Sequence, residues 1–538
     1  MNKIFKTTAL VAAMATQASW AQTVPDAGQI LRDLTPAPSA PRPSPSFQLQ
    51  APAPAVTSPG GQAVVLRSVQ IVGATVLTEA VLLQAMGDVV GQSFDLAGLR
   101  ALTMRVSNRY REAGYPFARA FIPPQDMKDG ALRIEVLEGR YGEVKAVGDA
   151  ALQDGVQRFL APLVTGQVID SKLLEQVTLL IDDLPDLAIT PLIRPGQTLG
   201  TGDLDVRISR TPPVSGELGL DNHGNYYSGE WRARAAVNVN GALTLGDTLS
   251  VFGLYSEQAL WLANVNYSFP VGVYGLRANA GYANTSYDLG HGFEGNTGTA
   301  KVSTLGLAYP VLRSQQSNLN LNVNVQEKKL LNSRTYGADL EAYSLMNTPV
   351  MLQFDHRDSL GAGGITYGAL VWTPGKLNLA AGGAEHFSKI NADVMRMQNL
   401  GGKWSVYGRV SAQTASRNLN SAESFSLGGP TGVRAYPTGE ANGDGGWLTQ
   451  IEIRYAGGNL TPYAFYDHGR VKVDAQPSLV SSPSPDKERA GFGAGVRFAL
   501  GQWSADAALA WRSTGGAPEA VTGKDPKPRG WVNVTYRF

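Results

Sequence analysis

The sequence of 538 residues predicts an all-β transmembrane barrel of about 16 antiparallel strands, preceded by two small N-terminal α+β domains. Every second residue of 531–538 is apolar, the chain ends on the aromatic Phe538, and the same alternation recurs in residues 261–269, 319–326, 491–500 and 502–512. The mature chain has no run of roughly 18 apolar residues that would suit a transmembrane helix. Because open strand edges are not tolerated in lipid, membrane-spanning strands must close into a barrel.

The composition narrows the possible functions. The formal net charge of +1 argues against nucleic acid as a partner, and the absence of cysteine removes disulfides, thiol catalysis and cysteine-based metal sites. The five histidines are scattered, and neither they nor the carboxylates show the spacing of metal ligands. His468 follows Asp467 directly, but neighbours on a strand point to opposite faces, which argues against a catalytic pair. We therefore predict no enzymatic activity, no cofactor and no bound metal.

The first residues predict export from the cytoplasm. Lys3 and Lys6 precede a short apolar segment at 7–16, and small residues at the usual spacing precede Gln22. We interpret residues 1–21 as a cleaved secretory signal peptide. A signal peptide combined with a barrel predicts the outer membrane of a Gram-negative bacterium, with membrane lipids around the barrel.

Two short segments separate the signal from the first domain. In residues 22–34, Ile30, Leu31 and Leu34 share one face of a short helix that Asp26 caps; the alternative is a disordered tail. Residues 35–61 are crowded with prolines, which favour an extended and semi-rigid linker.

Two α+β domains and the barrel follow. Residues 62–140 predict the order β-α-α-β-β, residues 141–210 repeat it more weakly, and residues 211–538 form the barrel. Residues 336–357 fit either one long strand or two.

Short turns at 457–459 and 501–502 alternate with long connections at 472–488 and 513–527. Since such barrels place short turns on the periplasmic side, residues 423–446 are predicted to be an unusually long extracellular loop.

This loop contains a fixed charge, Arg434, next to Tyr436 in a stretch rich in glycine and proline. Further along the chain, one strand places Asp467 on the same face as Phe465 and Gly469. If the loop folds back into the lumen, Arg434 meets Asp467 in a partly desolvated pair. The alternative is that Arg434 is a surface charge and Asp467 is simply a polar residue facing the lumen.

The run from Ser424 to Tyr436 resembles the sixth-loop signature of two-partner secretion transporters, the ShlB/FhaC/HecB type of hemolysin secretion and activation protein. Residues 463–469 resemble the strand that partners this loop, and residues 114–116, 122–125 and 136–139 resemble the family's first POTRA domain. The chain departs from the signature at Ala435, where the family usually has glycine.

The resemblance implies a 16-stranded barrel with two POTRA domains, an N-terminal plug helix and a loop inserted into the lumen. It implies that the loop is anchored or gated by Gly432, Val433, Arg434, Tyr436, Phe465, Asp467 and Gly469, that the plug presents Ile30, Leu31 and Leu34, and that Phe538 is the terminal barrel signature. It also implies an unfolded secreted partner of the hemolysin or adhesin type, which binds the POTRA domains and crosses without ATP. Periplasmic chaperones and the barrel assembly machinery are possible further partners.

Two alternative functions remain at this point. An insertase that assembles other barrels shares the loop motif, but its bacterial members usually carry more POTRA domains than residues 62–210 can hold. A diffusion porin explains the alternating strands but neither the periplasmic domains nor the loop around Arg434.

Overall fold

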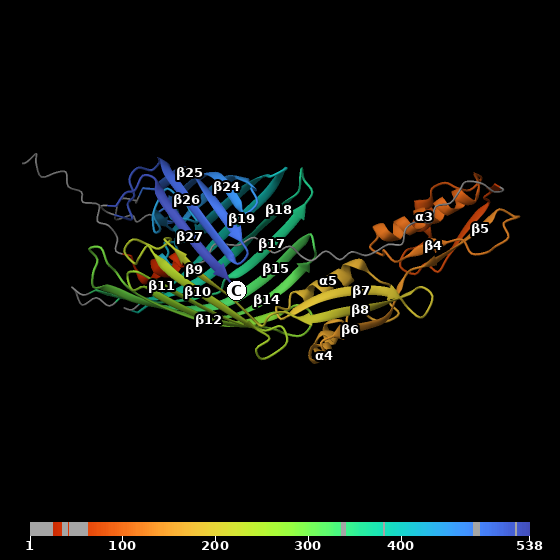
Figure 1. Ribbon diagram of the computed structural model, residues 1–538, viewed down its shortest axis with the longest axis horizontal. Coiled ribbons are helices and arrows are strands. Elements are labelled where there is room, and N and C mark those ends of the chain that lie inside the picture. The colour runs from red at the N-terminus through yellow and green to blue at the C-terminus, as the bar shows by residue number, and fades with distance from the viewer. Residues whose placement is uncertain are drawn as a thin grey trace, which may run out of the picture.

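The computed structural model describes residues 25–34, 41, 63–334, 341–379, 382–476, 485–521 and 524–538. Figure 1 shows a barrel with two α+β modules following one another away from one of its ends. The predicted signal peptide at 1–21 lies outside the described residues, as does the predicted linker at 35–61 apart from Pro41.

The barrel is closed and antiparallel, and its last strand pairs with its first. Its strands are β9 (Val214–Asp221), β10 (Arg232–Asn240), β11 (Thr248–Ser256), β12 (Trp261–Pro270), β13 (Arg277–Asp288), β14 (Asn296–Arg313), β15 (Ser317–Arg334), β16 (Glu341–Asn347), β17 (Val350–Asp358), β18 (Gly364–Leu379), β19 (Ala384–Gly401), β20 (Trp404–Ala415), β23 (Gly445–Tyr455), β24 (Leu460–Lys472), β25 (Lys487–Leu500), β26 (Trp503–Thr514) and β27 (Arg529–Arg537).

Two of these 17 strands share one position, so the barrel has 16 positions and the predicted fold class is confirmed. Both β16 and β17 pair with β15 on one side and with β18 on the other. They are separated at Thr348 and Pro349, where proline lacks the N–H that a continuous strand needs. Within the described residues, the ambiguous segment 336–357 is therefore one barrel position built from two pieces.

The two faces of the strands differ as the alternation predicts. On β27, Val532 is 38% exposed on the outer face, whereas the inward Thr535 is 4% exposed. Trp503 and Leu509 of β26 are likewise exposed on the outside. No helix in the described part of the chain is long and apolar enough to cross a membrane.

The bounds of the predicted loop at 423–446 need correction, because the connection between β20 and β23 runs from 416 to 444. We call residues 416–444 the inserted loop. The glycines at 445 and 446 resemble a turn in the sequence, yet they belong to β23, where Gly446 pairs with Gln413. A glycine in a strand often marks such a close approach of two backbones.

The first module packs two helices on a mixed sheet of the order β2-β5-β4. Its elements are β1 (Val64–Val65), β2 (Ser68–Val72), α2 (Glu79–Met86), β3 (Ser93–Phe94), α3 (Leu96–Glu112), β4 (Arg119–Phe121) and β5 (Ala131–Leu137). The predicted order β-α-α-β-β is present, with the small pair β1–β3 added to it.

A buried carboxylate holds the first module together. Glu138 Oε1 accepts hydrogen bonds from the backbone N–H of Thr75 (2.6 Å) and Val76 (2.9 Å) and from the hydroxyl of Tyr110 (3.0 Å). Burial alone would raise the pKa of Glu138, but these hydrogen bonds and one from the Thr75 hydroxyl hold it below its usual value. The adjacent Gly139 has φ +72°, and a Cβ there would lie 2.6 Å from Phe117 Cβ. These contacts explain the glutamate and the glycine in the motif at 136–139.

The second module repeats the architecture with a sheet of the order β6-β8-β7. Its elements are β6 (Arg140–Gly148), α4 (Ala150–Phe159), α5 (Ser171–Asp182), β7 (Leu187–Pro195) and β8 (Thr201–Arg210).

This second module is fixed to the short turns of the barrel. Arg313 donates two hydrogen bonds of 2.7 Å to Asp183, and the N–H of Gly246 donates to Asp186 Oδ1 at 3.1 Å. Leu245, from the β10–β11 turn, packs against the module's apolar core. The short turns therefore lie on the side of the modules and the long connections at the opposite end, as the predicted topology requires.

Candidate functional site

The inserted loop folds inside the barrel instead of extending from it. It contains the short elements η1 (Ser421–Glu423), β21 (Phe425–Ser426) and β22 (Asn442–Gly443), and β21 pairs with β22. Val433 and Tyr436 are fully buried, and the N–H of Val433 donates to the carbonyl of Leu427 at 2.6 Å. A Cβ at Gly432 would collide with that same carbonyl oxygen. The glycine at 432 is therefore a steric requirement of the fold of the loop.

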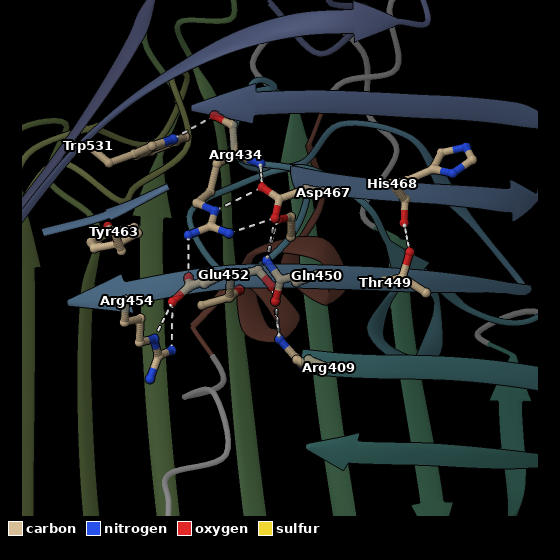
Figure 2. Close-up of polar contacts among 12 residues, drawn as sticks. Arg409, Arg434, Thr449, Gln450, Glu452, Arg454, Tyr463, Asp467, His468 and Trp531 are labelled. Carbon is tan, nitrogen blue, oxygen red and sulfur yellow. Dashed lines mark hydrogen bonds and ion pairs between the residues drawn. The ribbon is translucent and has the colours of Figure 1, made fainter. Parts of the chain in front are cut away.

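Arg434 and Asp467 form a buried ion pair (Figure 2). The Nε, Nη2 and backbone N–H of Arg434 donate to the Asp467 carboxylate at 2.8, 2.6 and 3.0 Å. Nη1 donates to Glu452 at 2.6 Å, and the guanidinium carbon lies 3.5 Å from the centre of the Phe465 ring. Trp531 Nε1 donates to the Arg434 carbonyl at 2.7 Å. Arg434 is 5% exposed and Asp467 is 0% exposed, so the alternative of a surface arginine does not hold.

Three glycine and alanine positions allow this close packing. A Cβ at Gly469 would lie 2.7 Å from the Trp447 carbonyl and collide with Leu427. The Ala435 methyl group points at Gly491, where a Cβ would collide with it. The backbone φ angle of Ala435 is not positive, so alanine at this position brings no backbone strain. Its methyl group also fits, because Gly491 has no side chain to collide with it.

Sequence reasoning missed the second carboxylate of the site, Glu452. It accepts hydrogen bonds from Arg434, Arg454 and Arg497 and is 4% exposed. Gln450, two residues earlier on β23, donates to the Gly432 carbonyl at 2.8 Å. The β23–β24 register pairs Gln450 with Asp467, and the short turn at 457–459 implies this register. Counting back from that turn would have placed Gln450 beside Asp467 and Glu452 on the same face.

The base of the loop is held by a further ion cluster. The Glu423 carboxylate lies 2.6 Å from Lys328 Nζ and 2.8 Å from Lys389 Nζ, and Asn347 donates to it at 2.6 Å. These partners come from β15, β19 and β16, whereas Asp467 lies on β24. The loop therefore bridges separate sectors of the barrel wall.

A third contact joins the loop to the long connection after β26. Glu440 is 0% exposed and accepts hydrogen bonds from Arg489 Nε (2.9 Å) and from the backbone N–H of Glu519 (2.9 Å) and Ala520 (2.8 Å). Tyr436 donates from its hydroxyl to the Thr514 carbonyl at 2.7 Å. These bonds tie the loop to the end of the barrel that faces away from the modules.

Residues 27–33 form the helix α1 (Ala27–Asp33) inside the barrel. Ile30 is 1% exposed, Leu31 and Leu34 are partly buried, and the N-cap Asp26 accepts a hydrogen bond from the Ser421 hydroxyl at 2.6 Å. A Cβ at Gly28 would lie 2.6 Å from the backbone nitrogen of Ala422. Helix α1 therefore rests directly on η1, the base of the inserted loop.

Two other positions singled out in the sequence lie away from this site. Phe538 exchanges backbone hydrogen bonds of 2.9 and 3.0 Å with Gly216 and helps to close the barrel between its last and first strands. His468 points to the face opposite Asp467, where its Nε2 lies 2.8 Å from Glu488. Across the described ranges, no group of three or more histidine, aspartate or glutamate residues is placed to hold a metal ion.

Together, these features define a class of protein: an outer-membrane barrel whose lumen holds a loop and a helix, with α+β modules fixed to its periplasmic turns. The family model "Haemolysin secretion/activation protein ShlB/FhaC/HecB" matches residues 200–498, and the model "POTRA domain, ShlB-type" matches residues 64–139. This chain belongs to the ShlB/FhaC/HecB family.

Individual relatives agree with this assignment. The chain is 28% identical over 445 residues to the heme/hemopexin transporter protein HuxB of Haemophilus influenzae. The alignment covers 76% of each of the two chains. It is 25% identical over 419 residues to the outer membrane transporter CdiB of Escherichia coli, covering 74% of this chain and 70% of the relative. The solved structure of CdiB from Escherichia coli matches with a TM-score of 0.73 at 23% identity, over 92% of this chain and 94% of that one.

The chain is therefore an outer-membrane transporter of the two-partner secretion type, with its POTRA region in the periplasm. The family consists of transporters and not of enzymes. The insertase alternative is not favoured by these relatives.

Proposed function

We propose that this chain secretes an unfolded partner protein of the hemolysin or adhesin type, which binds its periplasmic domains and crosses the lumen without ATP. The observation that carries the proposal is that α1 and the inserted loop occupy the lumen beside modules fixed to the periplasmic turns. A diffusion porin needs a lumen open to small solutes, whereas an exporter needs one that is closed at rest. Relatives named as a heme/hemopexin transporter and a hemolysin transporter support this class of partner. The chain itself performs no catalysis in this proposal.

The proposed boundaries are residues 62–140 for the first POTRA domain, residues 141–210 for the second and residues 211–538 for the barrel. Two three-stranded sheets of matching order support the division into two POTRA domains, although Arg140 belongs to β6, the first strand of the second module. Residues 1–21 are the signal peptide, 22–34 carry the plug helix, and 35–61 link the plug to the first domain. This linker keeps the plug attached when the helix leaves the lumen.

Recognition of the partner starts at a sheet edge, where an extended chain can add as a further strand. Three edges are already covered. Along β6, the Gln157 side chain donates to the Val144 carbonyl and accepts from the Ala146 N–H. On β4, the N–H of Ala120 donates to the Ser107 hydroxyl at 2.9 Å. Strand β7 carries the prolines 191 and 195, which have no N–H to offer to a further strand.

The fourth edge, β2, is covered least firmly. Its Ile71 N–H donates to the Glu79 side chain at 3.2 Å, which a competing strand can displace. We therefore place the partner along β2. Because the chain has no cysteine, Gln70→Cys supplies a unique thiol for crosslinking to the partner, with Thr190→Cys on β7 as the matched control. Adducts at 190 but not at 70 would move the contact to β7.

The anchor of the inserted loop consists of Gly432, Val433, Arg434 and Tyr436 together with Phe465, Asp467 and Gly469. Its role is to hold the loop in one position on β24 while the rest of the lumen changes during transport. Buried ion pairs suit this role, because they specify one geometry and because breaking either partner leaves an uncompensated charge.

The plug helix, with Ile30, Leu31 and Leu34, closes the lumen at rest. With only seven residues it is not stable as an isolated helix, so it is expected to unwind once it leaves the barrel. Low intrinsic stability is the property that a gate requires. Folding of the exported chain outside the cell then makes the passage directional.

The test is a comparison of the culture-supernatant and outer-membrane proteomes of the native host with and without this chain. Loss of one or a few secreted proteins, with the other barrels unchanged, is the expected result and identifies the partner. A general fall in outer-membrane barrels would support the insertase, and no change in either proteome would support the porin.

A further inference from the structure

The lumen wall around α1 is apolar, which is unusual for the interior of a water-filled barrel. Six inward side chains form this surface, here called the apolar cradle, and each is between 0% and 8% exposed: Leu254, Leu262, Tyr287, Leu330, Leu345 and Phe387. The wall at the loop anchor is mixed, because β23 presents Gln450, Glu452 and Arg454 there beside a second buried apolar cluster that includes Leu448 and Phe465. The six side chains of the cradle are all uncharged, although Lys328 and Lys389 of the Glu423 cluster lie two residues from Leu330 and Phe387 on the same strands.

The cradle lies toward the outer end of the barrel. Its cluster includes Tyr227, Leu260 and Leu289, which lie in the connections after β9, β11 and β13. These connections are at the end opposite the turns that contact the second module. In Figure 1 the red helix α1 is seen through the barrel at that far end. A chain moving outward from the periplasm reaches the cradle late in its passage.

Helix α1 covers the cradle in the structure. It inserts Ala27 and Ile30, which are 0% and 1% exposed, and Leu31 and Leu34 pack against the same cluster. The N–H of Ala27 donates to Asn332 Oδ1 at 2.8 Å. A small side chain, a branched aliphatic side chain and a backbone N–H are features that many unfolded polypeptides can present.

Apolar packing is not the only way to hold a segment in this lumen. The inserted loop combines apolar packing with buried ion pairs at Arg434 and at Glu423. When α1 leaves, the cradle faces water unless another chain covers it, and apolar surface in water is unfavourable. The polypeptide in transit is the chain that enters the lumen at that moment.

We propose that the apolar cradle binds aliphatic segments of the exported polypeptide, and that α1 occupies this site as a competitor in the resting state. The inference rests on the proposed function, because it needs a polypeptide in the lumen. It assigns α1 a second property besides closing the pore: the helix mimics the bound segment. Binding near the outer end holds segments that have crossed while the following ones move up.

The experiment compares point variants of the full chain. Ile30→Asn releases the plug and leaves the wall intact, so it raises ion conductance and keeps export. In that background, Leu262→Asn weakens binding to the cradle about tenfold, the effect of losing one buried aliphatic side chain, and lowers the export rate in proportion. Ile365→Asn is the matched control, because Ile365 is 7% exposed in another cluster, with Tyr367 and Met395.

A second measurement tests the competition directly. A synthetic peptide of residues 25–34, added in excess to cells with the Ile30→Asn chain, is expected to slow export, and the Leu262→Asn change is expected to abolish this inhibition. Equal export rates for the Leu262→Asn and Ile365→Asn chains would overturn the inference and leave the cradle as a seat for the plug alone.

Two controls separate other causes. If Leu262→Asn prevents barrel assembly, seen as loss of the heat-modifiable band on gels, Leu345→Asn replaces it in the comparison. If the Ile30→Asn chain with an intact cradle assembles but secretes no partner, and the unmodified chain secretes none either, the proposed function fails and not the cradle inference.

Discussion

Replacing either member of the Arg434–Asp467 pair is expected to abolish export while the barrel still assembles. Asp467 accepts three hydrogen bonds from Arg434 and is 0% exposed, so Arg434→Ala leaves a buried carboxylate without its main partner. Loss of one partner of such a pair costs about 3–5 kcal/mol. At about 1.4 kcal/mol per factor of ten, the population of the anchored loop falls roughly 100- to 4000-fold relative to released forms.

Assembly survives because the loop keeps its other contacts. Glu423 still pairs with two lysines at the base, and Glu440 still pairs with Arg489. Arg434→Lys is expected to restore part of the function, because lysine keeps the charge but lacks the planar fork that bonds to both carboxylate oxygens. Arg454→Ala is the matched control, since Arg454 also pairs with Glu452 but is not hydrogen-bonded to the loop.

The assay is the amount of partner in the medium per folded barrel in the outer membrane. Secretion at the normal level by both Arg434→Ala and Asp467→Ala would refute the anchor. A double variant that is no worse than either single one is expected, because both changes break the same interaction.

Three further predictions concern other parts of the molecule. Deletion of residues 26–34 should raise single-channel conductance while largely sparing export; unchanged conductance in planar bilayers would count against a plug. Gly491→Ala should lower export because the new methyl group collides with that of Ala435, and the double variant with Ala435→Gly should recover it; a Gly491→Ala chain that secretes normally would contradict this. The pKa of the Glu138 carboxyl is lowered in the folded state. The ionised carboxylate therefore contributes fully to folding stability at pH values above the unfolded-state pKa of about 4.3, and this contribution is lost as the pH falls through the lowered pKa. Hydrogen exchange of β5 in the full chain should therefore accelerate in acid, with a weaker pH dependence in Glu138→Gln; identical pH profiles would be the contrary result.

Much of the architecture was predictable because its causes are local. Alternation with a period of two assigns each strand residue to lipid or lumen without knowledge of its neighbours. Turn lengths distinguish the periplasmic end of the barrel from the outer end, and they correctly place residues 457–459 on the side of the modules. The motif around Arg434 and the strand with Asp467 suggested a pair, but residue patterns alone favoured a surface arginine. Burial of both side chains decides between these two.

The sequence by itself determined which residues face inward, where the chain turns, and that a fixed positive charge lies in a constrained loop. Only the tertiary structure decided which inward residues meet. Glu423 contacts lysines 95 and 34 residues away, and Glu440 contacts Arg489 across 49 residues. The apolar cradle collects single leucine and aromatic side chains from strands that each look like ordinary half-buried strands. Such groupings depend on how the whole barrel closes and on what fills it, because contacts between distant segments are set by packing and not by local residue patterns.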